Sequence, residues 1–273
     1  MKKILTSNIL RFAAIGAMAQ NADIEVSYTA MSPNLKNGKV DVKNQYVLLA
    51  NATESKFFSP ITEYIDSLNS TPEGIAKYQE MSRSAAMKGD SDNLPRRDGS
   101  YYVIKSLADD LLRYYDIVGV DKLCYEETPD EWQWQVVDST KYILGYECIE
   151  ATADYHGRKW IVWFSPEIPI SNGPWKFGGL PGLILEASTD DGKYSFVATG
   201  IQQTTKAIGS VYLADEYEKT DRKSFLKAKR AFLDNPLGSL NAQMGGDITI
   251  SGNSGEPIFA SSDIVDLIEP DYK

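Results

Sequence analysis

The sequence is poor in the residues on which most metal sites and activated nucleophiles depend. It has one histidine, His156, and two cysteines, Cys124 and Cys148, among 273 residues. One histidine cannot build a histidine-rich zinc site, and no HExxH, CxxC or GxSxG motif occurs in the chain. We therefore expect no metal site and no cofactor, and we interpret His156 as a solvated residue in a turn.

Positive charge is also scarce. There are 28 lysines and arginines against 38 aspartates and glutamates, which gives a net charge of −10. A protein that binds nucleic acid through its phosphates needs a basic surface, so we expect no nucleic-acid partner. No apolar run beyond the N-terminal segment reaches the roughly 18 to 20 residues of a membrane-spanning helix, so we do not expect the chain to span a membrane.

Residues 1–19 have the pattern of a secretory signal peptide. Two lysines near the start precede a mostly apolar run, and Ala17-Met18-Ala19 has the small-x-small form of a cleavage site. Asn8 and Arg11 interrupt the apolar run, and the alternative is an amphipathic N-terminal helix of a cytosolic protein. We expect a mature chain that begins near Gln20 and lies in the periplasm or cell envelope.

The two cysteines allow two interpretations. An oxidising compartment permits Cys124 and Cys148 to form a disulfide, which would stabilise the fold by about 3 kcal/mol in the chain-entropy model. Alternatively, both are free thiols that pack as small hydrophobic side chains. The sequence leaves both interpretations open.

Two-residue alternation of apolar and polar side chains runs through about residues 23–58 and 100–213 and predicts strands. Asn-Gly within 36–39 and Asp-Gly within 190–193 predict hairpin turns, and 137–140 has turn composition between two further strands. The chain holds 16 Tyr, 9 Phe and 5 Trp, which favours sheet. We predict a mainly β domain, with an antiparallel meander or a curved, half-barrel-like sheet.

Helices are expected in two places. Ser59-Pro60 and Thr71-Pro72 can each start a helix, which predicts a helical insertion near 60–87. Apolar residues at helical spacing predict a second helical region near 220–233, which Asn235-Pro236 would end. We therefore divide the chain into a signal peptide, a single β-rich domain over 20–235, and a C-terminal extension over 236–273 that is partly disordered.

Residues 168–185 form the most distinctive stretch of the sequence, with three prolines and four glycines between two predicted strands. The stretch ends in the hexapeptide Gly179 to Ile184, and two strands precede it, over 145–151 and 157–164. In these three motifs the chain resembles the GLPGLI family of exported Bacteroidota proteins, over roughly residues 20–235. The resemblance implies an exported, β-rich domain associated with the cell envelope, and it brings no catalytic residues.

The same stretch has two physical interpretations. Pro181-Gly182 suits the centre of a type II turn, so the segment can be a structural corner that closes the sheet. Alternatively, it is a rigid binding lip that displays its aromatic and basic side chains. The candidate residues of the segment are Gly173, Pro174, Trp175, Lys176, Phe177, Gly179, Leu180, Pro181, Gly182, Leu183 and Ile184.

Two functional hypotheses follow. The first is a non-enzymatic envelope protein that binds an apolar ligand or an envelope protein partner on its curved sheet. The second is an envelope hydrolase that uses carboxylates, because acidic pairs occur at 109–110, 126–127 and 190–191. An apolar concavity with acids outside it favours the first hypothesis, and buried, clustered acids favour the second.

Overall fold

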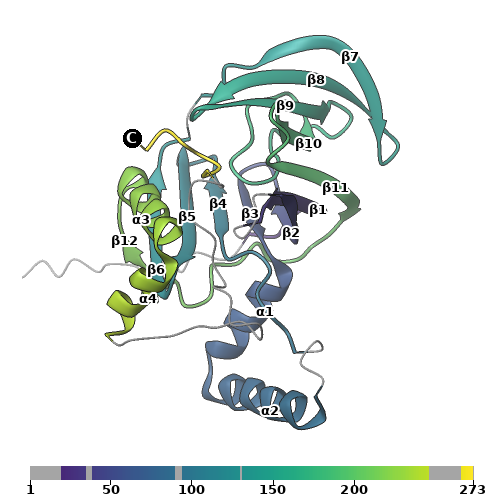
Figure 1. Cartoon of the computed structure of the whole chain (residues 1–273). Coiled ribbons are helices and arrows are strands. Elements are labelled where there is room, and N and C mark those ends of the chain that lie inside the picture. Colours follow the sequence, from purple (N-terminus) through teal and green to yellow (C-terminus); the bar gives the residue numbers. More distant parts are fainter. Residues whose placement is uncertain (1–19, 35–38, 90–93, 130, 246–265, 273) are drawn as a thin grey trace, which may run out of the picture.

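The computed structural model describes residues 20–34, 39–89, 94–129, 131–245 and 266–272 (Figure 1). The expected signal peptide, residues 1–19, lies outside the described residues, and so does most of the expected turn at 36–39. Cleavage near Gln20 therefore stays a prediction.

One curved, open sheet of twelve strands dominates the described chain, so the prediction of a mainly β fold is confirmed (Figure 1). Its strand order is β12-β6-β5-β4-β3-β2-β1-β11-β10-β9-β8-β7. Strands β6 to β1 form one meander, β11 to β7 form a second, and β1 pairs with β11 where they meet. Only β12, beside β6, runs parallel to its neighbour among the pairs described. The strands are β1 (Ile24–Pro33), β2 (Val40–Ala50), β3 (Glu54–Phe58), β4 (Tyr102–Ser106), β5 (Leu111–Val118), β6 (Asp121–Glu127), β7 (Gln135–Ile143), β8 (Tyr146–Tyr155), β9 (Arg158–Ser165), β10 (Leu183–Thr189), β11 (Ser195–Gln203) and β12 (Glu218–Lys219).

Side-chain alternation explains how the sheet directs its main core to one face. In β1, Val26, Tyr28 and Ala30 are buried and the residues between them are only half-buried. Buried residues of both meanders, such as Phe57 of β3 and Val162 of β9, belong to a single hydrophobic core. The main core therefore lies on one face of the curved sheet and joins the two meanders, while a smaller cluster that includes Leu49, Phe58 and Tyr102 lies on the other face.

The helices begin where the sequence places capping residues. Ser59 and Thr71 cap α1 (Pro60–Asn69) and α2 (Pro72–Lys88), which confirms the helical insertion near 60–87. The two helices project away from the sheet (Figure 1), and α2 buries no residue. The helix expected near 220–233 is confirmed as α3 (Arg222–Asp234), which packs against β5 and β6.

Two features differ from the sequence predictions, and a third shows which residues at the C-terminus are ordered. Residues 137–140 form no turn but lie within β7, whose pairing with β8 shifts register between Val136 and Thr140 because a bulge absorbs the irregularity. A further helix, α4 (Pro236–Met244), follows α3 directly. Residues 266–272, expected to belong to a partly disordered extension, pack into the core with Leu267 4% exposed and Glu269 2% exposed.

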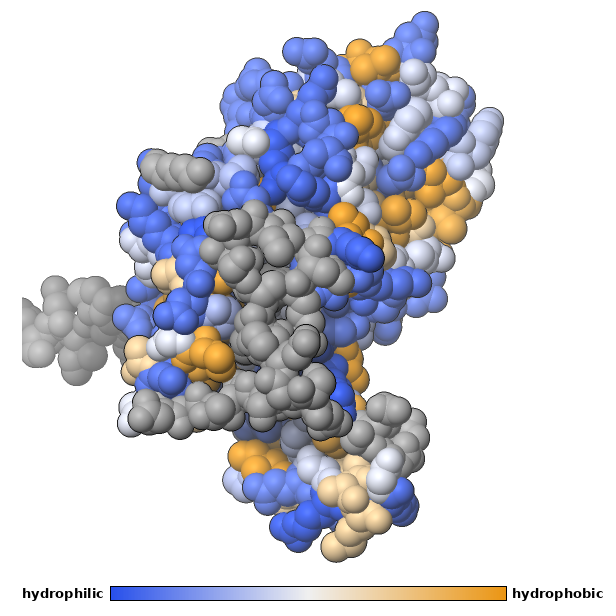
Figure 2. Space-filling model, in the orientation of Figure 1, coloured by the Kyte–Doolittle hydropathy of each residue, from blue (hydrophilic) through white to orange (hydrophobic). Residues whose placement is uncertain are grey.

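The surface is mostly hydrophilic, with separate hydrophobic patches in the view of Figure 2. Strand β7, the last in the sheet order, exposes several apolar side chains, including Val136 and Tyr142. Among the described residues, no helix combines the length and the apolar character needed to cross a membrane.

Candidate functional site

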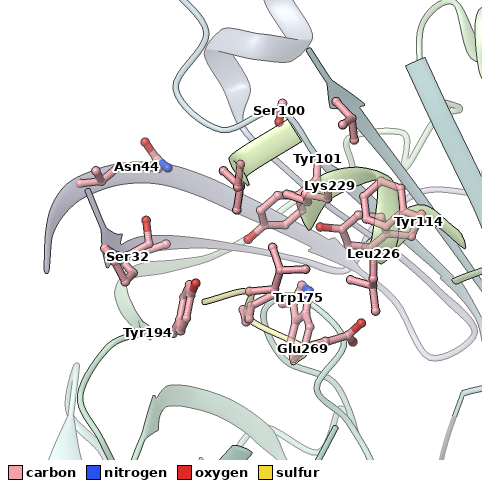
Figure 3. Close-up of a pocket in the computed structure, with 18 of the residues that line it drawn as sticks. Ser32, Asn44, Ser100, Tyr101, Tyr114, Trp175, Tyr194, Leu226, Lys229 and Glu269 are labelled. Atoms are coloured by element: carbon pink, nitrogen blue, oxygen red, sulfur yellow. The ribbon is translucent and has the colours of Figure 1, made fainter. Parts of the chain in front are cut away.

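The sheet, α3 and the C-terminal residues line a partly open cavity of about 400 Å³ (Figure 3). Ala30 of β1 and Tyr46 of β2 contribute to the sheet side, and Phe225 and Leu226 of α3 lie among the other lining residues. Trp175, from the glycine-rich stretch, is also part of the lining. The lining is predominantly apolar and aromatic, which is typical of a site for an apolar small molecule.

Four stacked tyrosines make up much of the sheet side of the cavity. The ring centroids lie 4.9 Å apart for Tyr46 and Tyr101, 5.5 Å for Tyr101 and Tyr114, and 5.1 Å for Tyr114 and Tyr125. The rings stack because β2, β5, β6 and the residue before β4 present them to the same face of the sheet. Burial raises the pKa of Tyr46, Tyr114 and Tyr125 well above the usual range, so their hydroxyls stay neutral.

One cationic side chain, Lys229 of α3, is among the residues that line the cavity. Its Nζ lies 2.6 Å from Oδ2 of Asp116, a fully buried carboxylate that also accepts hydrogen bonds from Ser100 and from the amide of Ile117. The carboxylate of Asp116 therefore neutralises the charge of Lys229, and the cavity presents mainly apolar surface to a ligand.

The glycine-rich stretch is held from inside by Lys105 of β4. Its Nζ donates hydrogen bonds to Oδ1 of Asn172 (2.8 Å) and to the carbonyls of Gly173 (3.2 Å) and Phe177 (2.6 Å). Burial lowers the pKa of Lys105 to about 7. This lysine was not among the candidate residues, because nothing in the sequence links residue 105 to residue 177.

The hydrophobic residues of the stretch are buried rather than displayed. Trp175 is 1% exposed, and Phe177, Leu183 and Ile184 are fully buried. The stretch does not form an exposed lip, and Trp175 belongs to both the core and the cavity wall. Among the other candidates, Gly173, Pro174 and Gly182 are buried and Leu180 is 3% exposed, whereas Gly179 and Pro181 are exposed.

The backbone of the corner differs from the expected type II turn. Gly179 has a positive φ of 81°, and so does Trp175, at 48°, whereas Gly182 does not. Gly182 is required for a different reason, because a Cβ built on it would lie 2.2 Å from the carbonyl oxygen of Ser165. A close approach of two backbone segments therefore fixes this glycine.

Lys176 is buried at the centre of an ionic cluster. Its Nζ lies 2.7 Å from Oε1 of Glu127 and 2.7 Å from Oε1 of Glu269. The same ammonium lies 5.1 Å from the ring centroid of Tyr125 and 5.6 Å from that of Trp175. Lys176 thereby connects the glycine-rich stretch to β6 and to the C-terminus.

Residues 266–272, which we call the C-terminal segment, complete the cavity wall. Arg158 donates hydrogen bonds from Nη2 and Nε to the carbonyl of Leu267, at 2.6 and 3.2 Å, and from Nε to that of Ile268, at 3.1 Å. The Tyr194 hydroxyl donates to the carbonyl of Asp266 at 2.5 Å. Leu267 and Ile268 both line the cavity.

Acidic side chains of the C-terminal segment are paired with bases of the body. Arg222 lies 2.9 Å from Oε2 of Glu269 and also pairs with Asp271. Nδ1 of His156 lies 2.7 Å from Oδ2 of Asp271, so the interpretation of His156 as a solvated residue is wrong, although it does lie in the β8–β9 turn. Burial raises the pKa of Asp271, but the hydrogen bond from Arg222 and the charge of His156 outweigh this and lower it.

The two cysteines are not joined. Cys124 and Cys148 are both buried and free, and they belong to two different hydrophobic clusters on β6 and β8. The disulfide interpretation is therefore corrected in favour of free thiols. Burial raises the pKa of Cys148 to about 11.

The carboxylates singled out in the sequence do not gather at one place. Asp109 accepts a hydrogen bond from Ser106 at the β4–β5 turn, and Asp191 pairs with Arg158 near the β10–β11 hairpin. Glu126 forms an exposed ion pair with Arg113, while Glu127 is bound to Lys176. Across the described ranges, no group of three or more histidine, cysteine or acidic residues is placed to hold a metal ion.

Comparison with known proteins gives a family of unknown function and a fold. A family model described as "Protein of unknown function (Porph_ging)" matches residues 155–186, which include the hexapeptide Gly179 to Ile184. The resemblance predicted from the sequence is thus supported at the level of a Bacteroidota-associated family of unknown function, over a short segment. No curated protein matches the chain.

Two solved structures of PNGF-II are similar to this chain, and the first of them shows a likeness in fold. The structure in space group P21 aligns with a TM-score of 0.50 and 14% identity, covering 75% of this chain and 32% of that chain. The structure in space group C2 gives a TM-score of 0.49, 14% identity, and coverage of 76% and 32%. The chain thus spans about a third of PNGF-II, and the likeness concerns the fold alone. The chain is similar, over residues 155–186, to a family whose function is unknown.

Proposed function

We propose that this protein binds an apolar ligand in the cavity between the curved sheet, α3 and the C-terminal segment. The observation that carries the proposal is the cavity itself, about 400 Å³ in volume and lined mainly by apolar and aromatic side chains. A site of this size and character can hold a small apolar molecule. The stacked tyrosines offer flat apolar rings and neutral hydroxyls, which suits a ligand with few charges.

The second hypothesis, a hydrolase that uses carboxylates, has less structural support. Glu269 is a carboxylate on the cavity wall, but its two oxygens are engaged by Lys176 and Arg222. A general acid or base must exchange a proton with its substrate, and a carboxylate held by two cations is poorly suited to this. The geometry therefore favours binding over catalysis at this cavity.

The binding proposal can be tested with the apolar fluorophore N-phenyl-1-naphthylamine. The full chain should enhance its fluorescence on binding, and Ala30→Phe should weaken the affinity by at least about tenfold, because the new ring fills space inside the cavity. Val197→Phe, on the neighbouring strand β11 but outside the cavity lining, is the matched control and should leave the affinity unchanged.

Ser32→Trp, at a half-buried lining position, is a second blocking variant in case Ala30→Phe disturbs the core. If the fluorophore does not bind the unmodified chain, or binds both blocking variants as tightly, the cavity is not an apolar binding site. Native mass spectrometry of the protein recovered from its source is an independent measurement, and it should show an apolar compound that copurifies with the unmodified chain.

We further propose that the chain is a GLPGLI-like protein exported to the periplasm or cell envelope. The basic start, apolar run and Ala-x-Ala ending of residues 1–19 support export. N-terminal sequencing of the protein from the envelope fraction should begin near Gln20. A sequence that still begins at Met1 would contradict the proposal.

A further inference from the structure

The contacts that hold the C-terminal segment are of the kind by which a protein binds a peptide. Arg158 and Tyr194 donate side-chain hydrogen bonds to main-chain carbonyls of the segment. Among the described residues, no main-chain hydrogen bond ties the segment to a strand or helix. The segment is therefore attached to the sheet by side chains alone, and these contacts can break without disrupting the ladder of the sheet.

The body of the protein presents these side chains in a fixed arrangement of its own. Arg158 also pairs with Asp191 (3.2 Å) and lies 4.8 Å from the Tyr194 ring. Lys176 has a second carboxylate partner in Glu127, which also lies 4.0 Å from Nε of Arg222. We call the surface formed by Arg158, Lys176, Tyr194 and Arg222 the cleft. Each of its three cations keeps an acidic neighbour when the segment is removed, so the charges of the cleft are balanced without the segment.

The contacts in the cleft also determine which kind of side chain fits at each successive position of the segment. It buries Leu267 beside the cavity, and two residues later it meets the carboxylate of Glu269 with Lys176 and Arg222. Gly157 leaves room for Pro270, because a Cβ on this glycine would lie 3.0 Å from the proline ring. Asp271 then reaches Arg222 and His156.

We propose that this cleft is a peptide-binding site for a short segment with two apolar residues followed by spaced carboxylates, and that residues 266–272 occupy it in cis. Glu269 and Asp271 supply the charge that complements Lys176 and Arg222. The site goes beyond the proposed function, since it recognises a peptide next to the cavity rather than a ligand within it. Release of the segment removes Leu267 and Ile268 from the cavity lining.

The first test uses a fluorescent peptide with the sequence of residues 266–272 and the full-length chain. The unmodified chain should bind it weakly, because the tethered segment competes at an effective concentration on the order of millimolar. The full-length variant Glu269→Gln/Asp271→Asn should bind the same peptide at least about tenfold more tightly, since its own segment no longer fills the cleft. A peptide with the same two substitutions is the matched control and should bind poorly to both proteins.

Equal binding of the peptide to both proteins, or equal binding of the two peptides to the variant, would overturn the proposal. Amide hydrogen exchange of the unmodified chain provides a second measurement that does not depend on the stability of the variant. The amides of the C-terminal segment should exchange through an opening that leaves the core strands protected. Exchange of the segment only together with β1 and β9 would make it an integral part of the core and also overturn the proposal.

These outcomes are distinguishable from those of the cavity test. Peptide binding without fluorophore binding would leave the peptide site in place and reject the proposed apolar ligand. Fluorophore binding without peptide binding would support the apolar ligand site and reject the peptide site.

Discussion

Gly182 illustrates how the approach of two backbone segments can fix a residue whose own dihedral angles are ordinary. Its φ is not positive, yet a Cβ at this position would lie 2.2 Å from the carbonyl oxygen of Ser165. The GLPGLI-type hexapeptide thus brings the corner close to the end of β9. Leu183 and Ile184, fully buried beside it, anchor the following strand in the core.

Gly182→Ala should lower the free energy of unfolding by about 1 to 3 kcal/mol, because the backbone must shift to make room for the methyl group. Gly200→Ala is the matched control, since Gly200 has no positive φ and a Cβ there meets nothing within 4 Å. The control should leave stability unchanged or slightly raised. Chemical denaturation of the two variants measures the difference. Equal stability would show that the backbone makes room for the methyl group at little cost in free energy.

Three helices share one start signal, a capping residue followed by proline. Ser59-Pro60 starts α1, Thr71-Pro72 starts α2, and Asn235-Pro236 starts α4. In the sequence, this signal predicts the first two helices, whereas Asn235-Pro236 predicts only the end of the helix near 220–233. The dipeptide has both roles, because Asn235 closes α3 and its side chain accepts a hydrogen bond from the amide of Gly238 in α4.

Asn235→Ala should destabilise the protein by about 1 kcal/mol, because the first turn of α4 loses its capping acceptor. Amide exchange in α4 should accelerate more than exchange in the sheet, since α4 lies at the edge of the fold and is joined to the β5–β6 turn through Gln243. Ser239→Ala, inside the same helix, is the control. If both variants unfold at the same denaturant concentration as the unmodified protein, Asn235 does not act as the cap.

The whole molecule combines two meanders into one sheet with a shared core, and its interior contains three buried lysines, Lys56, Lys105 and Lys176, and several buried tyrosines. Burial lowers the pKa of Lys105 to about 7, and burial raises the pKa of Tyr28 and Tyr46. These shifts act on stability in opposite directions as the pH rises.

Between pH 7 and the ordinary pKa of lysine near 10.4, the unfolded chain holds a proton that folded Lys105 has lost. Stability should therefore rise with pH in this window, by at most about 1.4 kcal/mol per pH unit from this group. Above about pH 10 the buried tyrosines reverse the trend, because they ionise more readily in the unfolded chain.

Denaturation midpoints of the unmodified protein and of Lys105→Met, measured from neutral to alkaline pH, check this prediction. The rise should be absent in Lys105→Met and retained in Lys77→Met, where the lysine replaced lies on the exposed helix α2. A rise of the same size in all three proteins would assign it to other groups.

The sequence by itself determined the mainly β class, the Asp-Gly hairpin between β10 and β11, and the helices α1 to α3. These features depend on side-chain alternation, turn residues and capping residues, which act within a few positions of the chain. The same local signals failed at 137–140, because Val136 and Thr140 both pair with β8 and the residues between them form a bulge rather than a turn.

Only the tertiary structure decided where the cavity, the ionic cluster and the peptide cleft lie. Lys105 binds a carbonyl 72 residues away, and Arg158 binds one 109 residues away. Such contacts depend on the order of strands in the sheet, and no periodicity of the sequence encodes that order. The sequence thus singled out the glycine-rich stretch as distinctive. The fold showed that its hydrophobic residues are buried, with Trp175 facing the cavity and Lys176 binding Glu269 of the C-terminal segment.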